Sequence, residues 1–337
     1  MTHAPQSLRL AAAPHLHGGN AVRRLTLHTV VALLPATVFA VALFGLAALA
    51  TLVVAILSCI LAERLCAPRS TLGDGSALLT GLLLGLSLPP ALPLWMVAVG
   101  GAVAMLVGKR LFGGLGGLVF HPALVGRVFL QAAFPVAMAQ GWLAPFASGR
   151  ASQLPGTSLA APFMAPEAAY DGLSGATPLA TARLGDGATP LADLWMGTVA
   201  GSVGETSAVL LLLGGLYLVA VRAADWRIPT ALLASVAVLS GALHEFDPTR
   251  YPGVLAALGS GGLMLGAWFL ATDSTSSPMT RKGAWIYGLA IGALVVLIRQ
   301  FSGQPEGVMY ALLLGSALTP HIDRWTRPRP LRSRGAR

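Results

Sequence analysis

Thr177 lies in a polar stretch whose residue types could carry a covalently attached group. The stretch, DGLSGATPLAT at residues 171–181, falls in the longest polar interval of an otherwise apolar chain. Its glycines and proline predict an exposed loop rather than a membrane helix. A threonine hydroxyl can accept a phosphoester, Gly175 and Ala176 leave the backbone open to a bulky phosphate, and Pro178 fixes the chain directly afterwards. The residues alone leave a plain Gly/Ser/Thr/Pro loop as the alternative.

The composition predicts that most of the chain faces lipid or other apolar helices. Of 337 residues, 55% are hydrophobic and only 10% are charged, whereas a soluble domain has about 25% charged residues. A spanning helix needs about 20 mostly apolar residues, so the fold class is an all-α polytopic membrane protein. The net charge of +9 does not indicate nucleic-acid binding, because the basic residues lie in short loops and in the C-terminal tail. The two cysteines, Cys59 and Cys66, are too few for a metal or iron–sulfur set.

Ten apolar runs predict the spans, and the charges between them predict the orientation. With both termini cytoplasmic, 17 of the 22 Lys and Arg residues fall in cytoplasmic segments and four in outer segments, as the positive-inside rule requires. The spans are 25–44, 46–63, 75–90, 93–108, 119–139, 205–221, 228–243, 253–271, 284–299 and 305–320. The resulting domains are a cytoplasmic N-terminal segment (1–24), a first repeat of five spans (25–139), an outer loop carrying Thr177 (140–204), a second repeat of five spans (205–320) and a basic cytoplasmic tail (321–337).

A faint internal similarity predicts an inverted repeat. The third span of each half is rich in glycine and ends in a polar, proline-containing break, at residues 74–90 and 261–278. Because each half has five spans, the two halves run in opposite senses across the membrane. Broken Gly/Pro-rich helices of such repeats meet near the midplane and frame a site. Glycine placed for helix packing alone is the simpler alternative.

Five stretches together resemble one family over about residues 20–325. Each is moderately specific by itself, and all five occur in the family's order. They are DGSALLT (74–80), HPALVGR (121–127), SGATPL (174–179), ATD through SPMT (271–280) and YALLLG through proline (310–320). The chain thereby resembles the D subunits of Rnf ion-translocating electron-transport complexes, which are similar to the B subunit of the sodium-pumping NADH:quinone reductase.

The resemblance implies a flavin-carrying subunit of a bacterial cytoplasmic-membrane complex. FMN would be joined to Thr177 by a phosphoester bond, within a motif that includes Asp171, Ser174, Gly175 and Ala176 and that a flavin transferase reads outside the membrane. A second, non-covalent flavin, riboflavin, would lie between the halves. The complex would couple electron transfer between ferredoxin and NAD to Na⁺ or H⁺ movement. The implied partners are an outer flavoprotein subunit, iron–sulfur subunits in the membrane and an NAD-side subunit.

Several polar residues inside or beside the spans are further candidates. Arg127 lies within a span, where a charge usually faces a cavity, a partner or an anion. It could neutralise a reduced flavin or its phosphate, or it could pair with a group of its own helix or of the other repeat, such as a carboxylate. Asp273 and Asp74 are each expected at a broken-helix end, as a cap or as a flavin contact, with capping favoured for Asp74. His121 could line the same break as Arg127, although related proteins usually carry Asn there.

Two glutamates are expected to have a simpler role. Glu205 and Glu306 each begin a predicted span, where helix N-termini favour acids, and neither is expected to bind an ion.

Other function classes remain open at this point. Inverted repeats with broken helices are common in transporters, and the fold also resembles urea channels, so a channel or transporter without redox chemistry is the main rival. A purely structural scaffold within a larger complex is the third possibility. The scarcity of carboxylates within the spans argues against a pump complete in this chain alone.

Overall fold

Every element of the structure is a helix within the part of the chain that it describes. This computed structural model describes residues 21–66, 73–146, 154, 156–162, 177–184, 189–205, 207–248, 250–302 and 306–327. Helices occur in each of the ten ranges predicted as spans. The all-α polytopic fold class is therefore confirmed.

The first half contains two long helices and three that are shorter or interrupted. A π-helical segment, η2, continues α4 without a break, and Phe134 separates α5 from α6. The elements are α1 (Ala21–Phe44), α2 (Leu46–Cys66), α3 (Ser76–Ser87), α4 (Leu94–Val103), η2 (Ala104–Arg110), α5 (Pro122–Ala133) and α6 (Pro135–Gln140).

The remaining helices belong to the connection between the halves and to the second half. Three short helices lie between the halves: η3 (Gly156–Leu159), α7 (Pro178–Leu184) and α8 (Leu191–Met196). The second half comprises α9 (Ala208–Ala220), α10 (Arg227–Phe246), α11 (Val254–Gly259), α12 (Leu263–Leu265), η4 (Gly266–Leu270), α13 (Arg281–Phe301) and α14 (Val308–Thr326).

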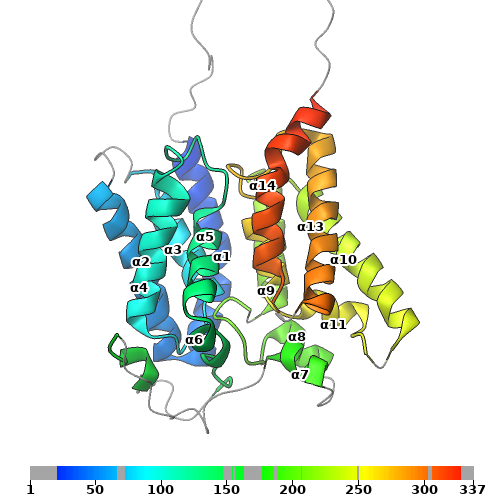
Figure 1. Cartoon of the computed structure of the whole chain (residues 1–337), viewed down its shortest axis with the longest axis horizontal. Helices are drawn as coiled ribbons and strands as arrows, with labels where there is room; N and C mark the ends of the chain where they lie inside the picture. The colour runs from blue at the N-terminus through cyan, green and yellow to red at the C-terminus, as the bar shows by residue number, and fades with distance from the viewer. Residues whose placement is uncertain are drawn as a thin grey trace, which may run out of the picture.

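The two halves are inverted relative to each other. The described chain begins and ends at one end of the helical bundle, here called the terminal face, whereas α7 and α8 lie at the opposite end, here called the loop face (Figure 1). Helix α1 therefore runs away from the terminal face, and its counterpart α9 runs towards it. Within the halves, α2 packs on α3 and α4 as α10 packs on α11 and α13, and between the halves α1 packs on α9 and α5 on α14.

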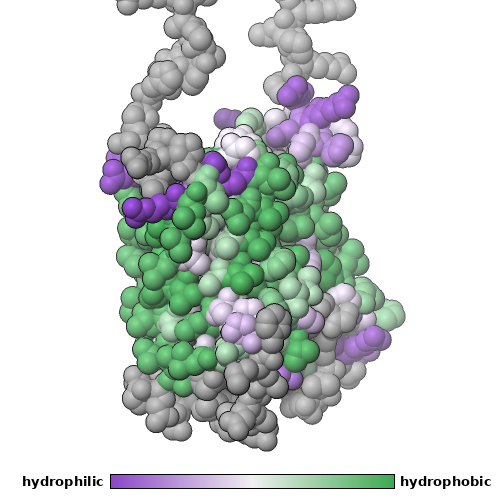
Figure 2. Space-filling model, turned by 60° about the vertical axis from the view of Figure 1, so that its left-hand side comes forward, coloured by the Kyte–Doolittle hydropathy of each residue, from purple (hydrophilic) through white to green (hydrophobic). Residues whose placement is uncertain are grey.

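An apolar surface surrounds the bundle between the two faces. Four of the described helices, α1, α2, α10 and α13, are long and apolar enough to cross a membrane. The side of the molecule is largely hydrophobic, with hydrophilic residues gathered mainly at the terminal face (Figure 2). Large apolar side chains such as Val38, Leu57 and Val238 point outward. Such a belt matches the lipid-facing surface of a membrane protein.

The third helix of each half is broken, and its free carbonyl groups are satisfied by the other parts of the fold. In the first half α3 ends at Ser87, and the carbonyl of Leu88 accepts a hydrogen bond from Val203 N at 3.0 Å. Gly204 N donates to the carbonyl of Leu86 in the same way. Backbone groups freed by a break need such partners when water is absent.

The break in the second half is satisfied by a side chain. Arg299, near the end of α13, donates to the carbonyl oxygens of Ala257 at 2.9 Å and Ser260 at 2.8 Å. These carbonyls end α11, just before the Gly261–Gly262 turn that leads into α12. The carbonyl groups at the first break thus accept from backbone N–H groups, whereas those at the second break accept from the guanidinium of Arg299.

Two basic residues that the charge count placed in segments outside the spans, Lys109 and Arg299, are buried in the structure. Lys109 lies in η2 and is 3% exposed, and Arg299 lies in α13 and is 5% exposed. Each donates hydrogen bonds to acceptors within the protein. A loop charge and a buried charge at a helix end cannot be distinguished by position in the sequence, because only packing brings the acceptors to them.

Candidate functional site

Thr177 lies directly before α7 and is buried, which contradicts the expected exposed loop. The residue is 6% exposed, and its hydroxyl accepts a hydrogen bond from Ala180 N at 3.3 Å. Its carbonyl accepts from Ala180 N and Thr181 N, so Thr177 begins the helix and Pro178 occupies the first turn, where its missing N–H has no cost. The motif therefore starts a helix at Thr177 instead of remaining a turn.

The helix that begins at Thr177 contacts the second half through Leu179. A Cβ added to Gly261 would come within 2.8 Å of Leu179 Cδ1 and 3.0 Å of Arg299 Nη2. The segment that follows Thr177 thus contacts the break of the second half beside Arg299. The other motif residues, Asp171, Ser174, Gly175 and Ala176, lie outside the described residues.

The Thr177 hydroxyl can be esterified by a phosphate without loss of a hydrogen bond to the described residues. Among the described residues its hydroxyl accepts one hydrogen bond and donates none. Ester formation removes only the hydroxyl proton, so it breaks no hydrogen bond of the described structure. Because Thr177 is only 6% exposed, its hydroxyl would have to become accessible before an enzyme could add such a group.

Arg127 pairs with a carboxylate of the opposite half, as one of the two sequence-based interpretations predicted. Its Nη2 donates to Glu306 Oε2, although 179 positions separate the two residues in the chain. Arg127 is 4% exposed, and its Nη1 has no partner among the described groups. The position of Arg127 on α5 and of Glu306 before α14 makes this pair a link between the repeats.

Two further charged residues complete a buried network around this pair. The carboxyl group of Glu205 lies within hydrogen-bonding range of Glu306, and both carboxyl groups interact electrostatically with Arg299. Ser202 N donates to Glu205 Oε2 at 3.4 Å. The glutamates were predicted to begin their helices, and they lie two or three residues before α9 and α14. Their side chains belong to a largely enclosed four-residue network, Arg127, Glu205, Arg299 and Glu306, hereafter the loop-face network.

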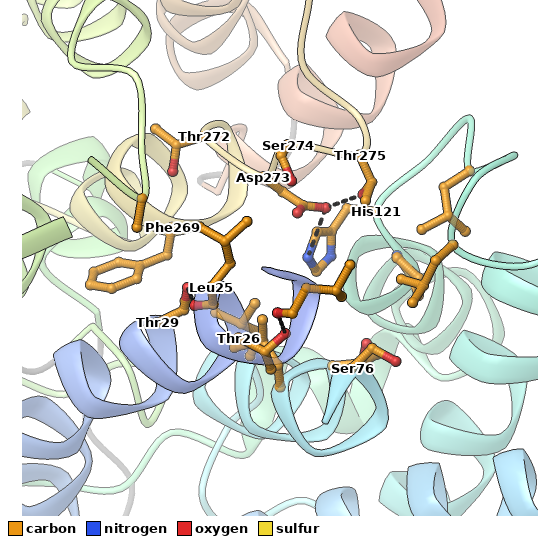
Figure 3. A pocket seen from close by; sticks show the side chains of 18 of the residues that line it. Leu25, Thr26, Thr29, Ser76, His121, Phe269, Thr272, Asp273, Ser274 and Thr275 are labelled. Atoms are coloured by element: carbon orange, nitrogen blue, oxygen red, sulfur yellow. Dashed lines mark hydrogen bonds and ion pairs between the residues drawn. The ribbon is translucent and has the colours of Figure 1, made fainter. Parts of the chain in front are cut away.

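A cavity of about 290 Å³ lies between the halves near the terminal face. Apolar side chains of α1, α3 and η4, including Leu25, Leu83 and Phe269, form much of its wall. Its polar groups come from both halves, and all of them except Lys109 are labelled in Figure 3. They are Thr26, Thr29, Ser76, Lys109, His121, Thr272, Asp273, Ser274 and Thr275. An apolar pocket with a few convergent polar groups is typical of a small-molecule site, and this volume is near the lower limit of such sites.

His121 and Asp273 face each other across this cavity (Figure 3). His121 caps α5, because its Nδ1 accepts from Ala123 N at 3.2 Å. This bond makes Nδ1 the acceptor, so Nε2 carries the proton and points towards Asp273 Oδ2 at 3.8 Å, beyond hydrogen-bond range. Asp273 also accepts from the hydroxyl of Thr275. The two residues therefore offer a donor and an acceptor from opposite halves of the fold.

The predicted capping role of Asp74 is wrong. Gly75 occupies the N-cap of α3 with a φ of 71°, and no side chain caps that helix. The positive φ favours glycine, and it turns the chain so that Ser76, rather than Asp74, opens the helix.

A second buried ion pair lines the cavity and was missed by sequence reasoning. Lys109 Nζ donates to Glu63 and, at 2.7 Å, to Ser76 Oγ, and both charged side chains are under 5% exposed. Lys109 lies on the π-helical segment η2, a geometry that often marks functional sites. The charge of Glu63 within a predicted span was the available signal, since a buried acid needs a partner.

Comparison with known proteins now assigns the chain to a family. The model of the NQR2, RnfD, RnfE family matches residues 9–332. The chain belongs to this family. A relative from Stutzerimonas stutzeri, named as the D subunit of an ion-translocating oxidoreductase complex, is 42% identical over 92% of both chains.

Two further members of the NQR2, RnfD, RnfE family carry more specific names. One is the D subunit of a proton-translocating ferredoxin:NAD(+) oxidoreductase complex from Clostridium ljungdahlii, 38% identical over 95% of this chain and 94% of its own. The other is the D subunit of a Na(+)-translocating ferredoxin:NAD(+) oxidoreductase complex from Acetobacterium woodii, 36% identical over 96% of this chain and 95% of its own. The family resemblance seen in the motifs is thereby confirmed.

Proposed function

We propose that this chain is the D subunit of an ion-translocating oxidoreductase complex that couples electron transfer between ferredoxin and NAD to ion movement across the bacterial cytoplasmic membrane. The full-length family match carries this proposal, because relatives covering nearly the same residues are named as that subunit. The apolar belt supports a place in the membrane. The chain's contribution is to hold flavins, with FMN on Thr177 and a second, non-covalent flavin in the terminal-face cavity. Flavins, when bound, supply one-electron chemistry.

The attachment of FMN at Thr177 is supported by the chemistry of that residue. Its hydroxyl donates no hydrogen bond in the described structure, and the first turn of α7 fixes its backbone. Contact of Leu179 with the break at Gly261 would hold the attachment point against the second half. Asp171, Ser174, Gly175 and Ala176 would form the sequence read by the flavin transferase on the outer side.

The terminal-face cavity is the proposed place for a second flavin such as riboflavin. Its apolar walls suit a flat aromatic ring system, while His121, Asp273 and Lys109 could hydrogen-bond to polar atoms at the ring edge. Thr26 and Thr29 on α1 add hydroxyl groups that could meet a polar side chain of the ligand. Asp273 would thus contact the second flavin, whereas Arg127, engaged with Glu306, serves the loop-face network.

The partners proposed for this chain are the other subunits of the complex. They would be an outer flavoprotein subunit near Thr177, iron–sulfur subunits within the membrane and an NAD-side subunit. The relative at 38% identity is named as part of a proton-translocating complex and the one at 36% as part of a Na(+)-translocating complex. Similarity to them therefore does not indicate which ion is moved.

Mass spectrometry of the purified chain, produced together with its flavin transferase, tests the attachment. The peptide containing Thr177 should carry an FMN-sized adduct. The adduct should be absent in Thr177→Ala and present in the control Thr181→Ala, which removes a hydroxyl one turn later on the same helix. An unmodified Thr177 peptide would refute the covalent assignment, and colourless protein that carries a solute in vesicles would favour a channel instead.

The second site requires a separate measurement. In the Thr177→Ala protein, any flavin that remains after gel filtration and is released by denaturation belongs to a non-covalent site. Leu83→Trp should abolish this bound flavin by filling the cavity, whereas Leu57→Trp on the outer surface should not. Equal flavin content in both variants would show that the cavity is not the site.

A further inference from the structure

We propose that Glu205 and Glu306 bind one proton, shared between their carboxyl groups, within the loop-face network. The two residues come from different parts of the second half, one before α9 and one before α14. Neither residue has a role assigned in the preceding sections beyond membership of this network. The site does not depend on a flavin at Thr177.

The hydrogen bonding of the two carboxyl groups is incomplete without a proton. One oxygen of each has a donor: Glu205 Oε2 accepts from Ser202 N and Glu306 Oε2 accepts from Arg127 Nη2. The other oxygen of each, Oε1, is buried and has no partner among the described groups. Because an ionised carboxylate can only accept, two adjacent carboxylates leave both oxygens unsatisfied, whereas one proton provides the missing donor.

The position of the pair in the fold is fixed from several sides. A Cβ added to Gly262 would lie 3.4 Å from both Glu205 Oε1 and Met309 Cε, and Met309 lines a small cavity together with Arg127 and Glu306. Gly204, next to Glu205, is hydrogen-bonded to the end of α3. The backbone beside Glu205 is thus fixed by contacts that would break if it moved, and Met309 lies beside both Glu205 and the cavity lined by Glu306.

Repulsion between the two neighbouring carboxylates favours a single shared proton, while the surrounding cations oppose it. The groups that face the pair are Arg127 from α5, Arg299 from α13 and Tyr310 from α14. Arg299 also serves the carbonyls of Ala257 and Ser260, so its guanidinium is shared among several acceptors. Adjacent like charges in a buried site disfavour ionisation of both groups.

A metal ion fits this site poorly. Two guanidinium groups beside the carboxyls would repel a metal cation. The small cavity between Arg127, Gln131, Glu306 and Tyr310 has a volume of about 20 Å³, which is enough for a single water molecule. Such a water could serve Arg127 Nη1, leaving the proton between Glu205 and Glu306.

A proton at this pair would change the charge at the interface of the two repeats. With both glutamates ionised the network is neutral, and with one proton it carries a single positive charge. Helix α7, which begins at Thr177, contacts Gly261 next to Arg299. A charged group brought to the loop face near Thr177 would therefore lie close enough to change how tightly the pair binds this proton.

Infrared spectroscopy of the purified complex tests the proposal directly. At neutral pH the wild-type spectrum should contain a carboxylic-acid C=O band that shifts in D₂O. Glu306→Gln and Glu205→Gln should each remove it, since the proton is shared, whereas Glu63→Gln, which alters a buried carboxylate already paired with Lys109, should leave it in place. Circular dichroism checks that each variant remains folded.

Three results would overturn the proposal. The first is a wild-type spectrum without a carboxylic-acid band at neutral pH, which requires no variant to fold. The second is a band that survives in Glu205→Gln or in Glu306→Gln. The third is a band that disappears when Na⁺ replaces choline in the buffer, because that result would assign the site to a metal cation.

Discussion

The two junctions between the repeats, one near each face, are built from equivalent parts of the two halves. The junction at the terminal face contains a cavity, whereas the junction at the loop face is closed. At the terminal face the exit of η4, the start of α1 and the residue before α5 surround a cavity of about 290 Å³. At the loop face the exit of α3 is hydrogen-bonded by residues 203 and 204, and charged side chains occupy the space beside them. An inverted repeat gives two similar junctions, and the local side chains decide which of them can accept a ligand.

The two junctions also differ in how ion pairs are used. Arg127 and Glu306 are in direct contact and largely enclosed, with side chains 5% and 15% exposed. His121 and Asp273 are 3.8 Å apart, and the Asp273 side chain is 24% exposed. The first pair therefore connects the halves, whereas the second leaves its polar atoms available to a molecule in the cavity.

The largest expected effect on stability comes from breaking the ion pair between Arg127 and Glu306 at the loop face. Arg127→Met should lower the free energy of unfolding by about 3–5 kcal/mol, because it leaves Glu306 buried without its partner. The measurement is unfolding in mixed detergent micelles, followed by tryptophan fluorescence. The double variant Arg127→Met, Glu306→Met should recover most of this loss, and the exposed control Arg110→Met should change stability by less than about 0.5 kcal/mol.

A smaller effect is expected where the backbone closes the loop-face junction. Gly204→Ala should cost about 1–3 kcal/mol, because its Cβ would lie 2.8 Å from the carbonyl oxygen of Leu86. Gly253→Ala is the matched control, since nothing lies within 4 Å of a Cβ there and its φ is −62°. Equal thermal stability of the two variants would show that the junction is not tightly closed.

The terminal-face pair should contribute less to stability. Asp273→Asn should lower the free energy of unfolding by less than about 1 kcal/mol, since the pair is partly exposed and not in contact. The same variant should weaken the binding of free riboflavin, measured by equilibrium dialysis. A stability loss as large as that of Arg127→Met would remove the contrast between the two junctions.

The smallest effect is expected for His121→Asn. Asparagine is also a good N-cap, so its side chain can accept the hydrogen bond of Ala123 N in place of His121 Nδ1. Stability should change by less than about 0.5 kcal/mol, whereas His121→Ala should cost about 1 kcal/mol. Thermal unfolding of both variants side by side measures the difference, and an equal loss in the two would rule out the capping role.

The sequence by itself determined the class of fold and the position of the helices. Apolar runs of about 20 residues must be buried in lipid or against each other, and polar breaks must interrupt them, so the ten ranges follow from local composition. The need of Arg127 for a partner also follows locally, since a charge in an apolar span is costly alone. The motif around Thr177 was recognisable as a family signature for the same reason, because it is continuous in the chain.

Only the tertiary structure decided which groups meet. The partner of Arg127 is 179 positions away, and that of Lys109 is 46 positions away, so neither was visible in the sequence. The contact of Leu179 with Gly261 joins segments far apart in the chain, and the cavity depends on six separate segments that surround it. Contacts of this kind arise when helices from inverted halves pack together, and no local pattern of residue types specifies that packing.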